Sequence, residues 1–107
     1  MQEQDLKTIE IIAKEYFDKA NGNIYFSARV TLNYGLSDEV TLYLPFQYGY
    51  GEHYINMAKK EIAKYFVIDK NDSPEAFFIS LYVYNVVLRT NKEDNCKKRD
   101  VEDFGKA

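Results

Sequence analysis

Residues 24–48 read IYFSARVTLNYGLSDEVTLYLPFQY, and two alternating segments in this stretch decide the fold. Every second residue is apolar over 24–34, and the same alternation returns over 40–48. A period of two is typical of strands with one buried face. The turn residues 35–38 separate the two segments, so we expect a β-hairpin. Pro45 cannot donate a ladder hydrogen bond, which places the second strand at a sheet edge or beside a bulge.

The segments on either side of the hairpin repeat at a helical spacing instead. Apolar residues three and four apart run from Leu6 to Ala20, and Asn21-Gly22 is a typical helix end. A second stripe of the same period runs from Tyr54 to Phe66. We therefore expect an amphipathic helix over each segment, with both helices packed on one face of the sheet.

Residues 77–90 are dense in aromatic and β-branched side chains, so we predict a long third strand. A right-handed crossover through the second helix would bring it beside the first strand of the hairpin. The expected fold is α+β, with the element order α-β-β-α-β and a three-stranded antiparallel or mixed sheet of order 2-1-3. Residues 1–91 would form one domain, and the polar residues 92–107 a mobile tail or one weak helical turn around Val101 and Phe104.

Composition limits the classes of protein that the chain can belong to. Its 107 residues suit a single domain, and the net charge of -3 provides no positive field for steering to phosphates or anionic lipids. Cys96 is the sole cysteine, which favours a reducing compartment. The N-terminus has no secretory signal pattern, and no apolar run reaches the roughly 20 residues of a membrane span. We expect a soluble cytoplasmic protein without membrane contact.

The third strand has apolar side chains on both faces, whereas the helices can cover only one of them. The open face would present six residues that we predict to bind a protein partner: Tyr25, Arg29, Tyr43, Gln47, Tyr82 and Tyr84. The unpaired edge would join two copies in a homodimer through Ile79, Leu81, Val83, Asn85 and Val87. Alternatively, the tail or a bulge near Asn85 covers this surface within the monomer.

Aromatic residues on a sheet face also suit stacking on unpaired bases. Against this, Arg29 is the one basic residue between Asn23 and Gly51, and a groove for single strands needs several cations to follow the phosphates. Lysines of the second helix keep a single-stranded nucleic-acid-binding module as the alternative to protein binding.

The loop Gly49-Tyr50-Gly51 lies between a predicted strand and a predicted helix, where phosphate-binding loops also occur. It lacks a third glycine and the Lys-Ser/Thr pair, and Glu52 would repel an anion. His53 is the sole histidine and has no metal-ligand spacing around it. A flexible junction is the simpler interpretation, and a small catalytic or ligand-binding site around Gly49–His53 is a third class of function.

Cys96 precedes Lys97, Lys98 and Arg99, which could favour the thiolate, although an incidental free thiol is the simpler interpretation. No combination of nucleophile, base and orienting group can be identified in the sequence. We therefore expect no enzymatic activity, no metal and no cofactor. The predicted function is that of a small protein-binding or assembly module, acting as an accessory factor or inhibitor of a larger macromolecular complex.

Overall fold

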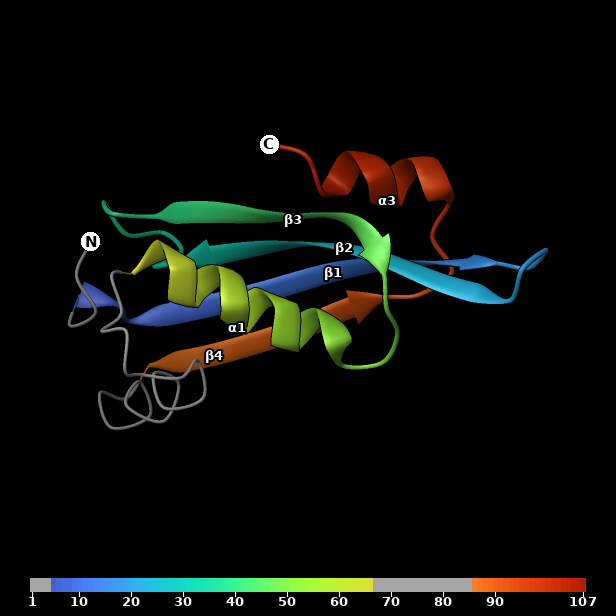
Figure 1. The fold of residues 1–107 in the computed structure, drawn as a ribbon. Helices are drawn as coiled ribbons and strands as arrows, with labels where there is room; N and C mark the ends of the chain where they lie inside the picture. Colours follow the sequence, from blue (N-terminus) through green and yellow to red (C-terminus); the bar gives the residue numbers. More distant parts are fainter. Residues whose placement is uncertain (1–4, 67–85) are drawn as a thin grey trace.

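The computed structural model describes residues 5–66 and 86–107, which form an α+β fold around one mixed sheet. The strands are β1 (Thr8–Asp18), β2 (Asn23–Leu32), β3 (Val40–Tyr48) and β4 (Val87–Glu93), and the helices are α1 (His53–Tyr65) and α3 (Lys98–Phe104). The strand order is β3-β2-β1-β4 (Figure 1). Neighbouring strands are antiparallel except β1 and β4, which are parallel.

The predicted hairpin and the helix that follows it are confirmed. β2 and β3 pair antiparallel with Leu32 opposite Val40, and α1 covers the segment that carries the second helical stripe. β3 is an edge strand among the described strands, as the proline at position 45 indicated. The ladder between β2 and β3 also shifts its register between Phe26 and Ala28, which marks a bulge.

The predicted N-terminal helix is wrong, because that segment forms β1. Ile9, Ile11 and Ala13 alternate with more exposed neighbours and are buried, which is the period of a strand. Pairing with β2 on one side and β4 on the other overrides the helical spacing of the apolar residues. The predicted helix end is the turn between β1 and β2, where Gly22 has a positive φ of 71° and its N–H donates to the Asp18 carbonyl.

The predicted three-stranded sheet of order 2-1-3 is corrected to four strands for the same reason. β1 occupies the place beside the hairpin that we assigned to the last strand, and the last strand pairs with β1 instead. Of the predicted strand over residues 77–90, residues 77–85 lie outside the described residues. The strand continues beyond the predicted end to Glu93.

α1 and α3 lie on opposite faces of the sheet, whereas the two helices that we predicted for one face were α1 and the segment that forms β1. Buried residues of α1 join a core with the inward residues of β1, β2 and β3, which include Phe26 and Ala28. Ser27 points the other way from these two neighbours and donates a hydrogen bond from its hydroxyl to the Val101 carbonyl in α3. Val101 is fully buried, so the helical alternative for this segment is the one found. No helix in residues 5–66 and 86–107 is long and apolar enough to cross a membrane.

The fully buried Asn33 ties the end of β2 to the beginning of β1. Its Oδ1 accepts hydrogen bonds from the backbone N–H groups of Lys7 (2.7 Å) and Thr8 (3.2 Å). Its Nδ2 donates to the Asp5 carbonyl (2.9 Å) and the Asp38 carboxylate (3.1 Å). Its φ of 55° suits asparagine, which tolerates the left-handed region better than most residues. One side chain therefore satisfies backbone groups that the sheet itself leaves unpaired.

Asn33→Ala should lower the free energy of unfolding by about 2–3 kcal/mol, because part-buried N–H groups lose their acceptor. Urea denaturation followed by circular dichroism measures this loss. Asn95→Ala is the matched control, since Asn95 also has a positive φ, of 58°, and its change should cost about 1 kcal/mol or less. Equal losses in the two variants would show that backbone conformation, not the hydrogen-bond network, explains the effect.

Candidate functional site

Tyr25 is the centre of an aromatic cluster at one end of the sheet, on the face that carries α3. Its ring stacks on Phe46 at a centroid distance of 5.0 Å and on Tyr16 at 6.5 Å. Tyr48 meets the Tyr25 ring edge-on at 5.9 Å. We call Tyr16, Tyr25, Phe46 and Tyr48 the aromatic cluster. Such ring pairs add about 0.5–1.5 kcal/mol each beyond the area that they bury, so the rings hold one another in place.

The bulge explains why sequence reasoning missed Phe46 and Tyr48. Continuous alternation along β3 places both residues with Leu44 on the core face. The extra residue at the register shift reverses the alternation, so that Tyr48 pairs with Tyr25 and Gln47 with Phe26. Gln47 was predicted on the open face and instead lies opposite a core residue, with its amide nitrogen donating to the Pro45 carbonyl at 2.9 Å. The proline was the signal for this bulge.

Arg29 and Tyr43 lie where we predicted them, but α3 covers the part of the face that they occupy. The Arg29 Nε donates to the Phe104 carbonyl at 3.0 Å, and its guanidinium lies 4.3 Å from the Phe104 ring centroid and 5.7 Å from that of Tyr43. The Lys14 ammonium approaches the same Phe104 ring at 5.1 Å. These cations are engaged by Phe104 of α3, and the aromatic cluster lies beyond them at one end of the face.

Most of the predicted third-strand residues cannot be compared with the structure. Tyr82, Tyr84, Ile79, Leu81, Val83 and Asn85 lie outside the described residues. Val87 is the first residue of β4, where its N–H donates to the Lys7 carbonyl at 3.0 Å and its side chain is 49% exposed. Val87 therefore belongs to an edge strand among the described strands, and its predicted role in self-association stays a prediction.

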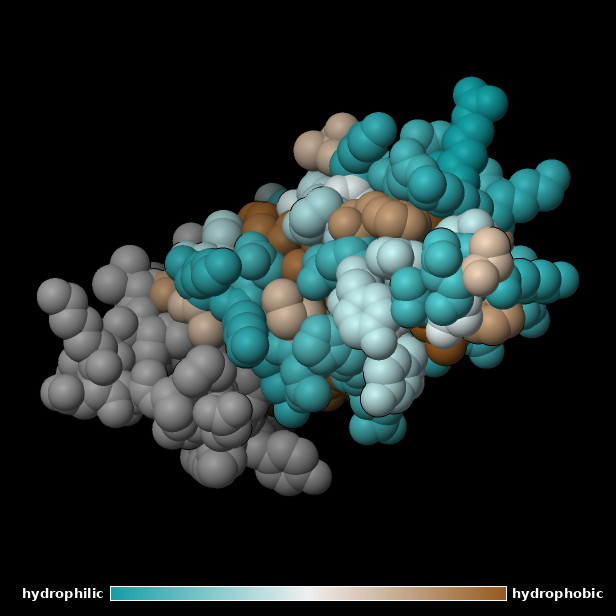
Figure 2. All heavy atoms as spheres, turned by 45° about the vertical axis from the view of Figure 1, so that its right-hand side comes forward, coloured by the Kyte–Doolittle hydropathy of each residue, from teal (hydrophilic) through white to brown (hydrophobic). Residues whose placement is uncertain are grey.

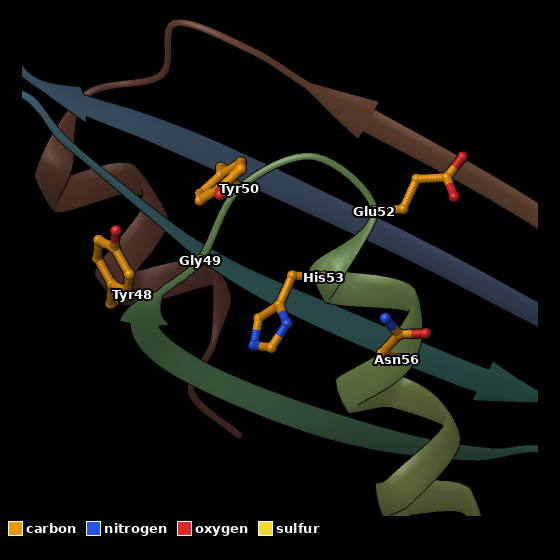
Figure 3. Close-up of a pocket in the computed structure, with 6 residues that line it drawn as sticks. All are labelled: Tyr48, Gly49, Tyr50, Glu52, His53 and Asn56. Atoms are coloured by element: carbon orange, nitrogen blue, oxygen red, sulfur yellow. The ribbon is translucent and has the colours of Figure 1, made fainter.

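The side of the molecule that carries the end of β3 and the beginning of α1 is mainly hydrophilic, with small separate hydrophobic patches (Figure 2). A pocket of about 410 Å³ lies there, at the loop that joins the two elements. Its lining residues are Tyr48, Gly49, Tyr50, Glu52, His53 and Asn56 (Figure 3). We call it the sheet-end pocket. It includes Gly49, Tyr50 and His53, around which we considered a small catalytic or ligand-binding site.

Tyr48 and Tyr50 are the most exposed aromatic side chains at this pocket, at 58% and 65%. The His53 ring is exposed too, but one edge of it packs against Phe26 at a centroid distance of 5.9 Å. A Cβ atom on Gly49 would lie 2.5 Å from His53 Cδ2 and 2.7 Å from Phe26 Cε1. Glycine is therefore the residue that lets the histidine lie against the end of the sheet.

The polar groups of the pocket side chains have no role in the fold of the described residues. Within residues 5–66 and 86–107, no hydrogen bond or ion pair engages the side chains of Tyr48, Tyr50, Glu52, His53 or Asn56. Four of these side chains can donate hydrogen bonds through a hydroxyl, imidazole or amide group, and Glu52 contributes a carboxylate. The pocket thus offers both aromatic surface and free hydrogen-bonding groups to a ligand.

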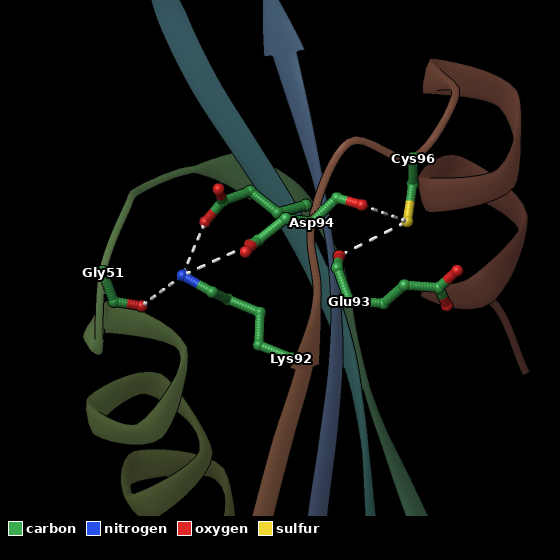
Figure 4. Close-up of polar contacts among 6 residues, drawn as sticks. Gly51, Lys92, Glu93, Asp94 and Cys96 are labelled. Carbon is green, nitrogen blue, oxygen red and sulfur yellow. Dashed lines mark hydrogen bonds and ion pairs between the residues drawn. The ribbon is translucent and has the colours of Figure 1, made fainter.

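Lys92 fastens the loop of the pocket to the sheet (Figure 4). Its Nζ lies 3.0 Å from the Glu15 carboxylate, 3.7 Å from that of Asp94 and 3.4 Å from the Gly51 carbonyl. Burial disfavours the charged form of Lys92, but the hydrogen bond and charge of Glu15 outweigh it and raise the pKa. Because this pKa is raised, the stabilisation from charged Lys92 is fully present below the ordinary lysine pKa and is lost as the pH rises through the raised value.

The other reactive groups do not form a chemical site in the described part of the chain. Burial raises the pKa of the Cys96 thiol, so the neighbouring cations do not produce the thiolate that we considered. The Cys96 Sγ instead donates to the Glu93 carbonyl at 3.3 Å. No group of three or more His, Cys, Asp or Glu residues in the described ranges could hold a metal ion.

Gly49→Ala should lower the free energy of unfolding by about 1–3 kcal/mol, since the added methyl group overlaps the His53 and Phe26 rings. Because His53 is the sole histidine, its ring signals in NMR spectra report directly on the displacement. Gly22→Ala is the control, since a Cβ there meets nothing within 4 Å and only the positive φ is strained. Unchanged His53 signals in Gly49→Ala would contradict the close packing.

Comparisons with known proteins offer no further guide to this site. No protein-family model, curated protein or solved structure matches the chain. The candidate site is therefore defined by its own geometry: a preorganised set of rings, a pocket beside them, and polar groups that the described part of the chain leaves unused.

Proposed function

We propose that this chain is a small non-catalytic module that binds a protein partner through the aromatic cluster and the sheet-end pocket. The observation that carries this proposal is the position of Tyr48. Its ring meets Tyr25 edge-on in the cluster, lines the pocket and remains 58% exposed. One continuous surface thus combines rigid rings with free polar groups, as do the centres of many protein interfaces.

The cost of binding is also low at this surface. Association must immobilise the side chains that it uses, at about 0.5–1.5 kcal/mol for each flexible one. Stacking already restrains Tyr16, Tyr25 and Phe46, and Gly49 with Phe26 already restrains His53. The mainly hydrophilic surroundings suit a partner that associates and dissociates, as accessory factors and inhibitors of larger complexes do (Figure 2).

Single-stranded nucleic acid is the alternative partner for the same rings. The charges favour it less, since Arg29 and Lys14 lie against Phe104 and the pocket itself contributes the carboxylate of Glu52. Phosphate binding weakens steeply between low and moderate salt, whereas contacts to tyrosine rings change little. A salt titration with a labelled oligonucleotide therefore separates the two partners.

Selection from a library of random peptides displayed on phage should enrich ligands that depend on this surface. Tyr48→Ala and Tyr50→Ala should each weaken the selected ligands by about tenfold, the usual effect of truncating a central interface aromatic. Tyr34→Ala is the matched control, because Tyr34 is 67% exposed but follows β2 at the opposite end of the sheet. Ligands that bind all three variants equally well would contradict the proposed surface.

We further propose self-association through β4, the second edge strand among the described strands. The N–H of Val87 points to β1, so strand geometry directs those of Leu88 and Thr90 away from it. Leu88 is 45% exposed, which leaves apolar surface beside this edge. In an antiparallel pair centred on Thr90, Arg89 would lie opposite Asn91 of the second copy, and like charges would not meet.

Sedimentation velocity at increasing concentration tests this pairing. The native chain should form dimers, and Thr90→Pro should remain monomeric because proline removes the N–H that the second copy would bind. Thr90→Ala is the control, since it keeps that N–H and should still dimerise. A native chain that stays monomeric at high concentration would remove dimerisation from the proposal and leave the tyrosine surface unaffected.

A further inference from the structure

We infer that the sheet-end pocket binds a proline-rich segment of the partner protein in the polyproline II conformation, with a basic residue of that segment beside Glu52. This inference rests on the proposed protein-binding function and specifies the chemistry of the partner. It follows from the hydrogen-bonding groups, the rings and the charge of the pocket.

Four side chains that line the pocket can donate hydrogen bonds, and the tyrosine hydroxyls and the asparagine amide can also accept them. Tyr48 and Tyr50 offer hydroxyl groups, His53 a ring N–H and Asn56 an amide, and none has a partner within residues 5–66 and 86–107. A proline-rich segment has the complementary chemistry. It lacks N–H groups at its prolines, and its carbonyl groups make no internal hydrogen bonds in the polyproline II helix. Donors on the protein therefore meet acceptors on the peptide.

The rings form the apolar part of the pocket. Tyr48, Tyr50 and His53 gather around Gly49, whereas Glu52 and Asn56 lie farther toward α1 (Figure 3). Grooves between aromatic rings are the usual receptors of polyproline II segments, because the pyrrolidine rings pack against flat aromatic surfaces. The segment itself is stiff before binding, so its ordering costs little entropy.

Addition of the partner as a β-strand is less suited to this place. An added strand would need a regular row of N–H and carbonyl groups along the outer edge of β3. Pro45 lacks one N–H, and the bulge interrupts the regular spacing of the others. The side-chain donors of the pocket can still bind the partner, because they do not depend on a regular β3 edge.

The negative charge of Glu52 favours a basic residue beside the prolines of the bound segment. Glu52 is exposed, provides the one carboxylate of the lining, and forms no ion pair with the described residues. The whole chain carries a net charge of -3, which adds to the attraction of a cation. Glu52 lies away from the Tyr48 end of the pocket, so the basic residue would flank the prolines rather than lie among them.

The test is a fluorescence anisotropy titration of the full chain with a fluorescein-labelled polyproline peptide that ends in arginine. Binding should be saturable, and a peptide with glycine in place of each proline should not bind. Tyr50→Ala should weaken binding by about tenfold, and Tyr34→Ala should leave it unchanged. Glu52→Gln should weaken binding of the arginine peptide by a few-fold but not that of a peptide ending in glutamine.

Absence of binding by the proline peptides, or equal binding of the glycine peptide, would overturn the inference. The peptides selected by phage display distinguish this failure from failure of the proposed function. Selected ligands that depend on Tyr48 and Tyr50 but contain no proline motif would refute the polyproline chemistry and leave the protein-binding surface intact. If no selected ligand depends on these tyrosines, both proposals fail.

Discussion

The pairing of β1 on both of its edges is the constraint on which the rest of the structure depends. β2 hydrogen-bonds to one edge from Ile9 to Asp18, and β4 hydrogen-bonds to the other from Thr8 to Lys14. The parallel pair with β4 joins the two ends of the chain, so this strand fixes where α3 can begin. The same strand contributes Ile9 and Ile11 to the core beneath α1. Without β1 between them, the hairpin and β4 would have no common partner.

The two faces of this sheet have different chemistry. The face under α1 stabilises the fold, and the face under α3 carries the surface that we propose for binding. The face under α1 is closed by apolar packing of fully buried residues. The face under α3 is held by hydrogen bonds from Ser27 and Arg29 to helix carbonyls and by cations against the Phe104 ring. Because α3 is short, it covers the middle of the second face and leaves the aromatic cluster beyond its reach. The aromatic cluster can therefore contact a partner while the core residues under α1 stay buried.

Local patterns in the sequence predicted the hairpin, the helix α1 and the edge position of β3, because each is determined by nearby residues. They failed for β1, where Ile9, Ile12, Ala13 and Tyr16 fit a helix while Ile9, Ile11 and Ala13 fit a strand. Pairing with β2 and with β4 selects the strand, and β4 lies roughly eighty residues away in the sequence, beyond the range of a local pattern. At the candidate site, Tyr25 was found by alternation, but Tyr48 was missed because the bulge reverses that alternation.

The bulge therefore connects an irregularity of the backbone to the proposed function. A regular β3 would direct Phe46 and Tyr48 to the core face, under α1, where neither could contact Tyr25. The extra residue near Pro45 directs both rings to the opposite face and brings Tyr48 beside the loop that begins at Gly49. The glycine then lets His53 approach the same point from α1. Substitutions that regularise β3 should consequently dismantle the aromatic cluster and the pocket together, because one feature of the backbone positions both.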